Sequence, residues 1–208
     1  LIAVFLGCKN QETVVGSIPT TDQQREAFVI AFGSCNKHDR NNPFWDDILA
    51  LQPDIFIWGG DIVYADSEDI NTIKATYEAQ RAVPGYAALL AQVPVTGTWD
   101  DHDYGVNDGG REFSIRKESQ QAFLDFMGVP KISPRRQQQG VYSSQLLKNT
   151  KGSVNIINLD TRYFRSALTK DPAKGKRYRP NSYGEGTLLG EEQWSWLGEQ
   201  LKSSKADF

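Results

Sequence analysis

The sequence predicts one α/β domain built around a parallel sheet, and three observations support this prediction. The chain has 208 residues, of which 39% are hydrophobic and 24% charged, which is the composition of a globular protein with one buried core. Two apolar runs of strand length, AFVIAF at 27–32 and IFIW at 55–58, flank a segment with helical periodicity. Strand, helix and strand in this order favour a parallel pair joined by a right-handed crossover.

The first of these strands, 27–32, is apolar without interruption, which predicts burial on both faces. Asn42 and Pro43 suit the cap and the first position of a helix that continues to about residue 51. The second strand follows at 55–58.

The rest of the chain continues to alternate between helical and extended patterns. The expected elements are helices at 70–91, 114–127 and 191–203, a strand at 93–99, and a hairpin of strands at 141–147 and 153–159. The first of these helices is expected to break at 84–85, where Pro and Gly occur. In the last helix, Trp194 and either Leu197 or Leu201 are expected to face inward.

The first 26 residues are predicted to lie outside the domain, which is expected over residues 27–208. LIAVFLGC resembles the end of a signal-peptide apolar region, and the small residue before Cys8 resembles a bacterial lipoprotein box. We therefore expect an exported protein, periplasmic, extracellular or anchored to the outer membrane through lipid at Cys8, with residues 9–26 as a polar tether. The alternative is a frayed first strand.

Charge and missing motifs narrow the possible functions. A formal net charge of -3 argues against a nucleic-acid-binding surface, because such a surface needs clustered Lys and Arg. Basic residues gather only at 165–179, where they either steer anionic substrates or belong to a solvated loop. The sequence has no GxGxxG, Walker A, GxSxG or CxxC pattern. Metal-assisted hydrolysis is the class that remains.

Polar residues follow three predicted strands in turn. Cys35 follows the first, Asp61 the second and the run 100–103 the third. Because α/β sheets bind ligands at the carboxyl ends of their strands, these residues are expected to converge. A thiol, a phenol, an imidazole and several carboxylates form a ligand set for transition metals.

Asp61 and Tyr64 belong to the stretch GGDIVYAD. If the chain turns sharply at 59–60, Asp61 lies at the strand tip and Tyr64, three positions on, folds back toward it. A phenol has a pKa of about 10, so it binds a metal only when a strongly Lewis-acidic ion such as Fe³⁺ displaces its proton. Cys35 can add a thiolate, and Asp61 can bridge to a second ion about 3.5 to 4 Å away. The alternative is a structural turn with a packed ring.

The stretch TWDDHDYG supplies the other candidates. Asp101 is expected to bind the second ion. His102 is expected to donate a hydrogen bond to a phosphoryl oxygen or a proton to the leaving group, oriented by Asp103 or Asp100. Arg162, at the end of the last predicted strand, either contacts substrate phosphate or forms an ion pair.

Other polar residues have weaker patterns. Asn107 and Asp108 either bind a metal ion or shape the Asn-Asp-Gly-Gly turn. His38, the only other histidine, is expected to be a solvated loop residue.

Five motifs together, in their order and spacing, indicate a family resemblance. They are FGSC, GGDIVYAD, TWDDHDYG, NLDTRYFR and GEEQWSWL. They resemble the alkaline phosphatase D (PhoD-like) family of the calcineurin-like metallophosphoesterase superfamily, over about residues 27–208. The resemblance implies a central β-sandwich flanked by helices (α/β/β/α). It also implies that Cys35, Asp61 and Tyr64 hold Fe³⁺. Asp61 and Asp101 would then hold Ca²⁺ or another divalent ion, with His102 facing the phosphate.

Two features depart from the wider superfamily. Ser34 and Cys35 stand where the superfamily has an Asp-x-His pair, as in the PhoD-like branch. The later GDxH-type segment of the family is not among the 208 residues. We therefore expect a C-terminally truncated chain with an incomplete metal shell, whose own activity is low or absent although the parent enzyme is active.

The predicted function is that of a metal-dependent phosphoric ester hydrolase acting on a phosphate ester, with no nucleic-acid partner. A phospholipase-type phosphodiesterase using the same site is one alternative. The other is a non-catalytic cell-surface binding protein that retains the scaffold.

Overall fold

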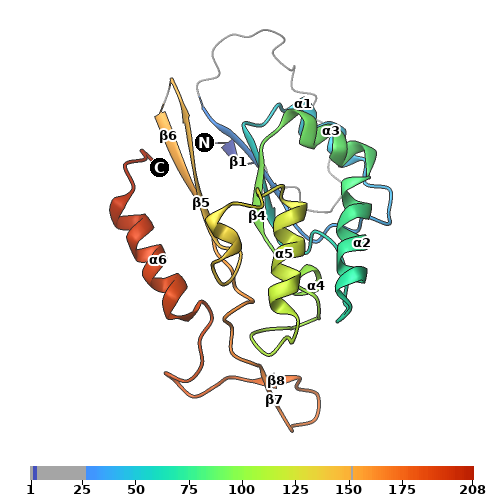
Figure 1. The fold of residues 1–208 in the computed structure, drawn as a ribbon, viewed down its shortest axis with the longest axis vertical. Helices are drawn as coiled ribbons and strands as arrows, with labels where there is room; N and C mark the ends of the chain where they lie inside the picture. The colour runs from blue at the N-terminus through green and yellow to red at the C-terminus, as the bar shows by residue number, and fades with distance from the viewer. Residues whose placement is uncertain (1, 4–26, 151) are drawn as a thin grey trace.

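A four-stranded sheet forms the centre of the computed structural model, which describes residues 2–3, 27–150 and 152–208 (Figure 1). The sheet contains β1 (Ile2–Ala3), β2 (Val29–Gly33), β3 (Ile55–Gly59) and β4 (Val95–Thr98) in this spatial order. All three neighbouring pairs are parallel, and Ile30 lies opposite Ile55. The predicted parallel pairing of the strands around 27–32 and 55–58 is therefore confirmed.

The predicted signal segment and tether fall almost wholly outside the described residues, and Cys8 is among those not described. Of this segment only Ile2 and Ala3 are described, and they pair with Val29 and Ile30 of β2. Among the described helices, none has the length and apolar character needed to cross a bilayer.

Helices connect the parallel strands. The elements are α1 (Phe44–Ala50) between β2 and β3, then α2 (Ile70–Arg81) and α3 (Pro84–Gln92) between β3 and β4. Asp69 caps α2 by accepting a hydrogen bond from the backbone N–H of Asn71. The helix predicted over 70–91 is interrupted at 82–83, directly before the predicted break at 84–85. Pro84 stands in the first turn of α3, where its missing backbone N–H costs no helical hydrogen bond.

The second half of the chain adds a hairpin and an outer helix. Its elements are α4 (Asp101–Tyr104), α5 (Arg116–Phe126), the 3-10 helix η1 (Pro134–Arg136), β5 (Ser143–Asn149), β6 (Gly152–Asn158), β7 (Thr169–Lys170), β8 (Tyr178–Arg179) and α6 (Gly190–Ser203). The antiparallel pairing of β5 and β6 confirms the predicted hairpin. The segment 100–110, which follows β4, contains the one-turn helix α4.

Side chains of β3 alternate between two hydrophobic clusters, as the period of a strand requires. Phe56 and Trp58 face the helices and pack with Trp45 and Tyr86. The Trp58 indole also donates a hydrogen bond of 3.0 Å to the Tyr86 hydroxyl. This larger cluster fixes α1 and α3 against the sheet.

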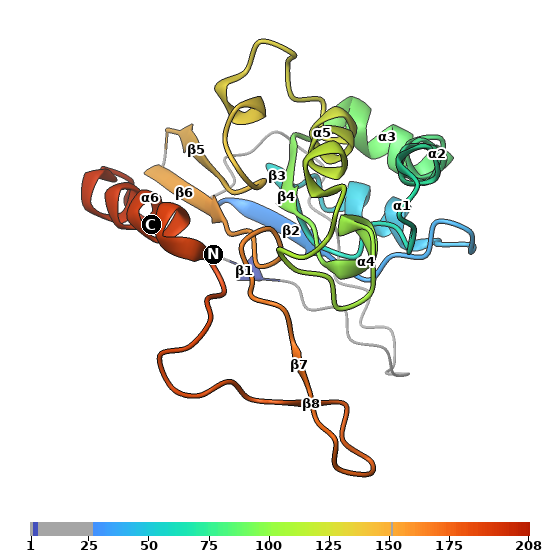
Figure 2. The ribbon, with the colours of Figure 1, turned by 60° about the horizontal axis from the view of Figure 1, so that its bottom comes forward.

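The opposite face of the sheet packs on the hairpin. Ile55 of β3 forms a small cluster with Val154 and Ile156 of β6. α6 lies along the outer side of this hairpin (Figures 1 and 2), where the rings of Tyr142 and Trp196 are 4.7 Å apart. The described residues thus form layers of helices, sheet, hairpin and helix.

Two burial predictions are wrong. Phe32 of β2 is 48% exposed, whereas Phe28 and Ile30 on the same face of the strand pack against the hairpin cluster. In α6, Trp194 is 57% exposed, so its predicted inward position is wrong. Of the two alternatives for the second inward residue, Leu197 is half-buried and Leu201 is 64% exposed. The buried residue of this helix is the polar Gln193.

Replacing Phe126 tests the larger hydrophobic cluster, on the face of the sheet that the helices cover. The ring of Phe126 stacks on Tyr77 at 4.8 Å and on Tyr86 at 5.8 Å, and it is almost fully buried. Phe126→Ala is expected to lower the free energy of unfolding by about 3 to 5 kcal/mol, because it removes both contacts and leaves a cavity. Urea denaturation measures the change. The exposed Ile132→Ala is the control, with an expected change below about 0.5 kcal/mol.

Candidate metal centre

The turn after β3 brings Asp61 to the tip of the sheet. Gly60 has φ +98°, and a Cβ there would lie 2.6 Å from the Cβ of Asp100, so only glycine fits at this position. Asp61 follows with φ +52°, a strained conformation for a non-glycine residue. The sharp turn predicted at 59–60 is therefore present, and it places the chains after β3 and β4 in contact.

Cys35 and Tyr64 approach the same oxygen of Asp61. The Tyr64 hydroxyl donates to Asp61 Oδ2 over 3.2 Å, and the Cys35 thiol donates to it over 3.7 Å. The turn thus folds Tyr64 back onto Asp61, and the neighbouring strand delivers Cys35. Lys37 Nζ lies 4.1 Å above the centre of the Tyr64 ring.

Asp101 and His102 lie in the first turn of α4, which begins shortly after the end of β4. Ligating atoms of Asp61, Asp101 and His102 all lie within 4.8 Å of one another, which is close enough to share a metal ion. The predicted convergence of Cys35, Asp61, Tyr64, Asp101 and His102 is therefore present in the structure.

Asp66 orients His102 through a 2.7 Å contact between its Oδ1 and the imidazole Nδ1. The rings of His102 and Tyr64 are 4.3 Å apart, so the imidazole is also packed. The expectation that Asp103 or Asp100 orients His102 is wrong, because the turn of α4 directs both of these side chains elsewhere. The spacing of GGDIVYAD was the signal for Asp66, since this residue lies only five positions after Asp61.

Asp103 is fully buried and connects the two strand ends. Its Oδ1 accepts hydrogen bonds from the N–H groups of Asp61 and Asp100, at 3.3 and 2.6 Å. Its Oδ2 accepts one from the N–H of Ile62 at 3.1 Å. The side chain therefore holds the backbone that carries both acidic segments of the site, although burial raises the pKa of Asp103.

Arg162 forms ion pairs at the edge of the cluster. Its Nε is 2.5 Å from Asp100 Oδ1, and its terminal nitrogen is 3.6 Å from Asp101 Oδ1. Of the two roles considered for Arg162, the ion pair is thus observed. The turn that presents Arg162 is held by buried Asp160, which accepts hydrogen bonds from the N–H of Arg162 and from two other backbone amides.

Gln193 of α6 completes the support of this turn. Its carboxamide both accepts from the N–H of Asp160 and donates to the carbonyl of Asp160, each at 2.8 Å. The buried face of α6 therefore carries a polar anchor, which explains why the neighbouring Trp194 points outward.

The electrostatics of the cluster favour a cation. Burial raises the pKa of Asp61, and the nearby negative charge of Asp100 raises it further. The pKa of Asp101 is lowered. Burial acts to raise it, but the hydrogen bond from the Asp108 N–H and the positive charge of Arg162 together have the larger effect. Burial, then the charges of Asp61 and Cys35, raise the pKa of Tyr64.

One oxygen of the cluster is left without a partner. Asp61 Oδ1 is buried and accepts no hydrogen bond from any described residue. An unpaired buried carboxylate oxygen is costly, and a bound cation would satisfy it. The residues present therefore fit a metal ion, with Asp61 at the centre of the donor set.

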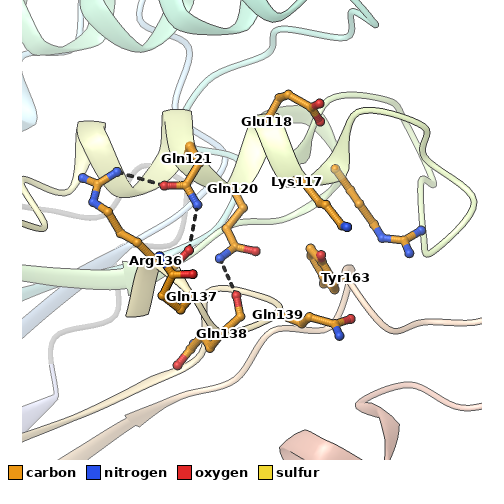
Figure 3. A pocket seen from close by; sticks show the side chains of 10 residues that line it. Lys117, Glu118, Gln120, Gln121, Arg136, Gln137, Gln138, Gln139 and Tyr163 are labelled. Atoms are coloured by element: carbon orange, nitrogen blue, oxygen red, sulfur yellow. Dashed lines mark hydrogen bonds between the residues drawn. The ribbon is translucent and has the colours of Figure 1, made fainter. Parts of the chain in front are cut away.

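A separate pocket of about 560 Å³ lies beside α5 (Figure 3). Its walls contain several carboxamides that pair within the wall, including Gln120, which donates to the carbonyl of Gln138. None of the residues of the acidic cluster lines this pocket. The pocket and the candidate metal centre are thus distinct features.

The fold and the site together define the class of the protein. It is an α/β protein in which residues suited to bind a metal ion gather at the carboxyl ends of the strands of a parallel sheet. The sequence matches the family described as PhoD-like phosphatase over residues 30–208, so the chain belongs to this family. A solved structure of PhoD is similar in fold, with a TM-score of 0.65 and 22% sequence identity. The similarity covers 88% of this chain and 41% of the PhoD chain. A search of curated proteins gave no match.

Asp103→Asn tests the brace between the strand ends. The carboxamide replaces one acceptor oxygen by a donor, so at least one buried backbone N–H loses its partner. We expect the free energy of unfolding to fall by about 1 to 3 kcal/mol, measured by urea denaturation. The exposed Asp39→Asn is the matched control, with an expected change within about 0.5 kcal/mol. Equal stabilities of the two variants would contradict the bracing role.

Proposed function

We propose that the protein is a metal-dependent phosphoric ester hydrolase with two ions bound around Asp61. The observation that carries the proposal is the position of this carboxylate. One oxygen faces Cys35 and Tyr64, and the other is buried without a partner among the described residues, while Asp101 and His102 lie within reach. Membership of the PhoD-like family supports the same reaction class.

The donor set supports two different ions. Cys35, Asp61 and Tyr64 would hold Fe³⁺, because a phenolate and a thiolate suit a strongly Lewis-acidic ion. Asp61 and Asp101 would hold Ca²⁺ or another divalent ion, which prefers oxygen ligands. Such ions supply positive charge to the phosphoryl oxygens and lower the pKa of water.

The chain's own residues bind and orient the phosphate ester. Asp66 fixes one imidazole nitrogen of His102, which leaves Nε2 to donate a hydrogen bond to a phosphoryl oxygen or a proton to the leaving group. Arg162 neutralises Asp100 and approaches Asp101, and it lies at the edge where a phosphate would also contact its guanidinium. The layered arrangement of helices, sheet, hairpin and helix supports the α/β/β/α sandwich of the calcineurin-like superfamily.

Two alternatives make different predictions. A phospholipase-type phosphodiesterase would hydrolyse bis-nitrophenyl phosphate or a phospholipid faster than nitrophenyl phosphate. A non-catalytic binding protein would contain no metal by elemental analysis of the full-length protein and would retain ligand binding.

The proposal also includes export, with lipid at Cys8 as the contact with the membrane, and it rests on the sequence of the first eight residues. Incorporation of labelled palmitate that is lost in Cys8→Ala tests it. Equal labelling of both proteins would contradict the lipid anchor.

Asp61→Asn is the decisive variant of the full-length protein. An amide lacks the charge needed to hold two cations, so metal content is expected to fall. Hydrolysis of nitrophenyl phosphate is expected to fall by at least about 100-fold in kcat/KM. Elemental analysis and steady-state kinetics measure the two effects. Asp39→Asn is the control, and unchanged hydrolysis in Asp61→Asn would overturn the proposed function.

His102→Ala separates catalysis from metal binding. If His102 donates to the phosphoryl group, kcat is expected to fall by about 100-fold or more while the metal content stays near that of the unmodified protein. Asp66→Asn is expected to lower kcat less, because it removes only the orienting contact. A loss of metal in His102→Ala would instead make this residue a ligand.

A further inference from the structure

Residues 166–187 form an arm that projects from the body of the protein and carries β7 and β8 (Figures 1 and 2). The base of the arm is closed by Ser166 and Thr187, whose backbone groups pair at 2.8 Å. Lys170, Lys174 and Lys176 are exposed along it. The arm is therefore accessible to solvent, and beyond its base its position relative to the body depends on a few specific contacts.

Asp108 provides such contacts. Its Oδ2 accepts a hydrogen bond from the Tyr178 hydroxyl at 2.9 Å and forms an ion pair with Arg177 at 2.6 Å. Its carbonyl accepts a hydrogen bond from Arg165, which lies directly before the arm. Asp108 adopts φ +58°, so the body holds it in a strained conformation at this position.

The backbone N–H of the same residue faces the candidate metal centre. It donates to Asp101 Oδ2 over 2.7 Å, which orients the Asp101 carboxylate. Asp108 thus contacts the arm through its carboxylate and carbonyl, and contacts a candidate ligand through its N–H. Displacement of Asp108 by movement of the arm would move the group that orients Asp101.

We propose that Asp108 is a positioning residue that couples docking of the arm to metal binding at Asp101. The inference rests on the proposed function only in taking Asp101 as a metal ligand. Since such coupling is reciprocal, docking of the arm raises the affinity for metal, and metal binding holds the arm docked by the same factor. The arm thereby changes how much metal the site holds, because it acts through the Asp108 N–H that orients the Asp101 carboxylate.

The test uses Tyr178→Phe in the full-length protein, because this change removes one hydroxyl of the arm and leaves residues 101–108 intact. Tyr183→Phe is the matched control, since Tyr183 is fully exposed on the same arm. Mn²⁺ is the probe, because oxygen-rich sites accept it. Calorimetric titration measures its affinity, and limited trypsin digestion measures cleavage after the arm lysines with and without Mn²⁺.

In the unmodified protein, Mn²⁺ is expected to slow cleavage of the arm. In Tyr178→Phe, the Kd for Mn²⁺ is expected to rise about tenfold, as for residues that orient ligands, and the protection of the arm by Mn²⁺ is expected to fall. Tyr183→Phe is expected to behave like the unmodified protein. Unfolding in urea should be the same for both variants, which distinguishes positioning from a general loss of stability.

Three results separate this inference from the proposed function. Equal Mn²⁺ affinity and equal protection in Tyr178→Phe and Tyr183→Phe would overturn the inference and leave the proposed function standing. Coupled binding and protection in a protein that hydrolyses no phosphate ester would support the inference and overturn the function. A protein that contains no metal by elemental analysis, binds no Mn²⁺ and whose arm is cleaved equally with and without the ion would overturn both.

Discussion

The buried carboxylate of Asp103 is the constraint on which the candidate site depends. Parallel pairing brings the carboxyl ends of β3 and β4 to one edge of the sheet, but it leaves the following loops free to diverge. Asp103 accepts hydrogen bonds from three backbone N–H groups of these loops, two in the loop after β3 and one in the loop after β4. A buried carboxylate is tolerated only when such donors surround it. The same contacts hold the acidic residues in place before any ligand binds.

The site also stores backbone strain. Cys35, Asp61 and Asp66 all have positive φ, which disfavours each of these residues in isolation. Such conformations persist because the surrounding structure over-determines them. Here the Asp103 brace, the close packing at Gly60 and the aromatic core beneath β3 supply that support. The result is a preorganised acidic cluster, in which repulsion between like charges is relieved by Arg162 and by the proposed cations.

Two of the failed predictions have separate physical causes. Apolar periodicity predicted an inward position for Trp194, yet the helix buries its neighbour Gln193, because the backbone of Asp160 needs hydrogen-bond partners in the interior. The residue that orients His102 was also misassigned, because neighbours in sequence were favoured over Asp66. In a turn of helix adjacent side chains diverge, and a residue from another strand end can lie closer.

Local pattern alone determined most of the strands and helices, the parallel pairing of β2 and β3, and the choice of Cys35, Asp61, Tyr64, Asp101 and His102. Those features depend on apolar runs, turn residues and unusual polar residues at strand ends, which are visible along the chain. Only the tertiary structure decided which carboxylate braces, which orients and which is left unpaired. It also decided that Asp108 connects the arm to Asp101. These roles depend on directions and distances between segments far apart in sequence, and no pattern along one chain encodes them.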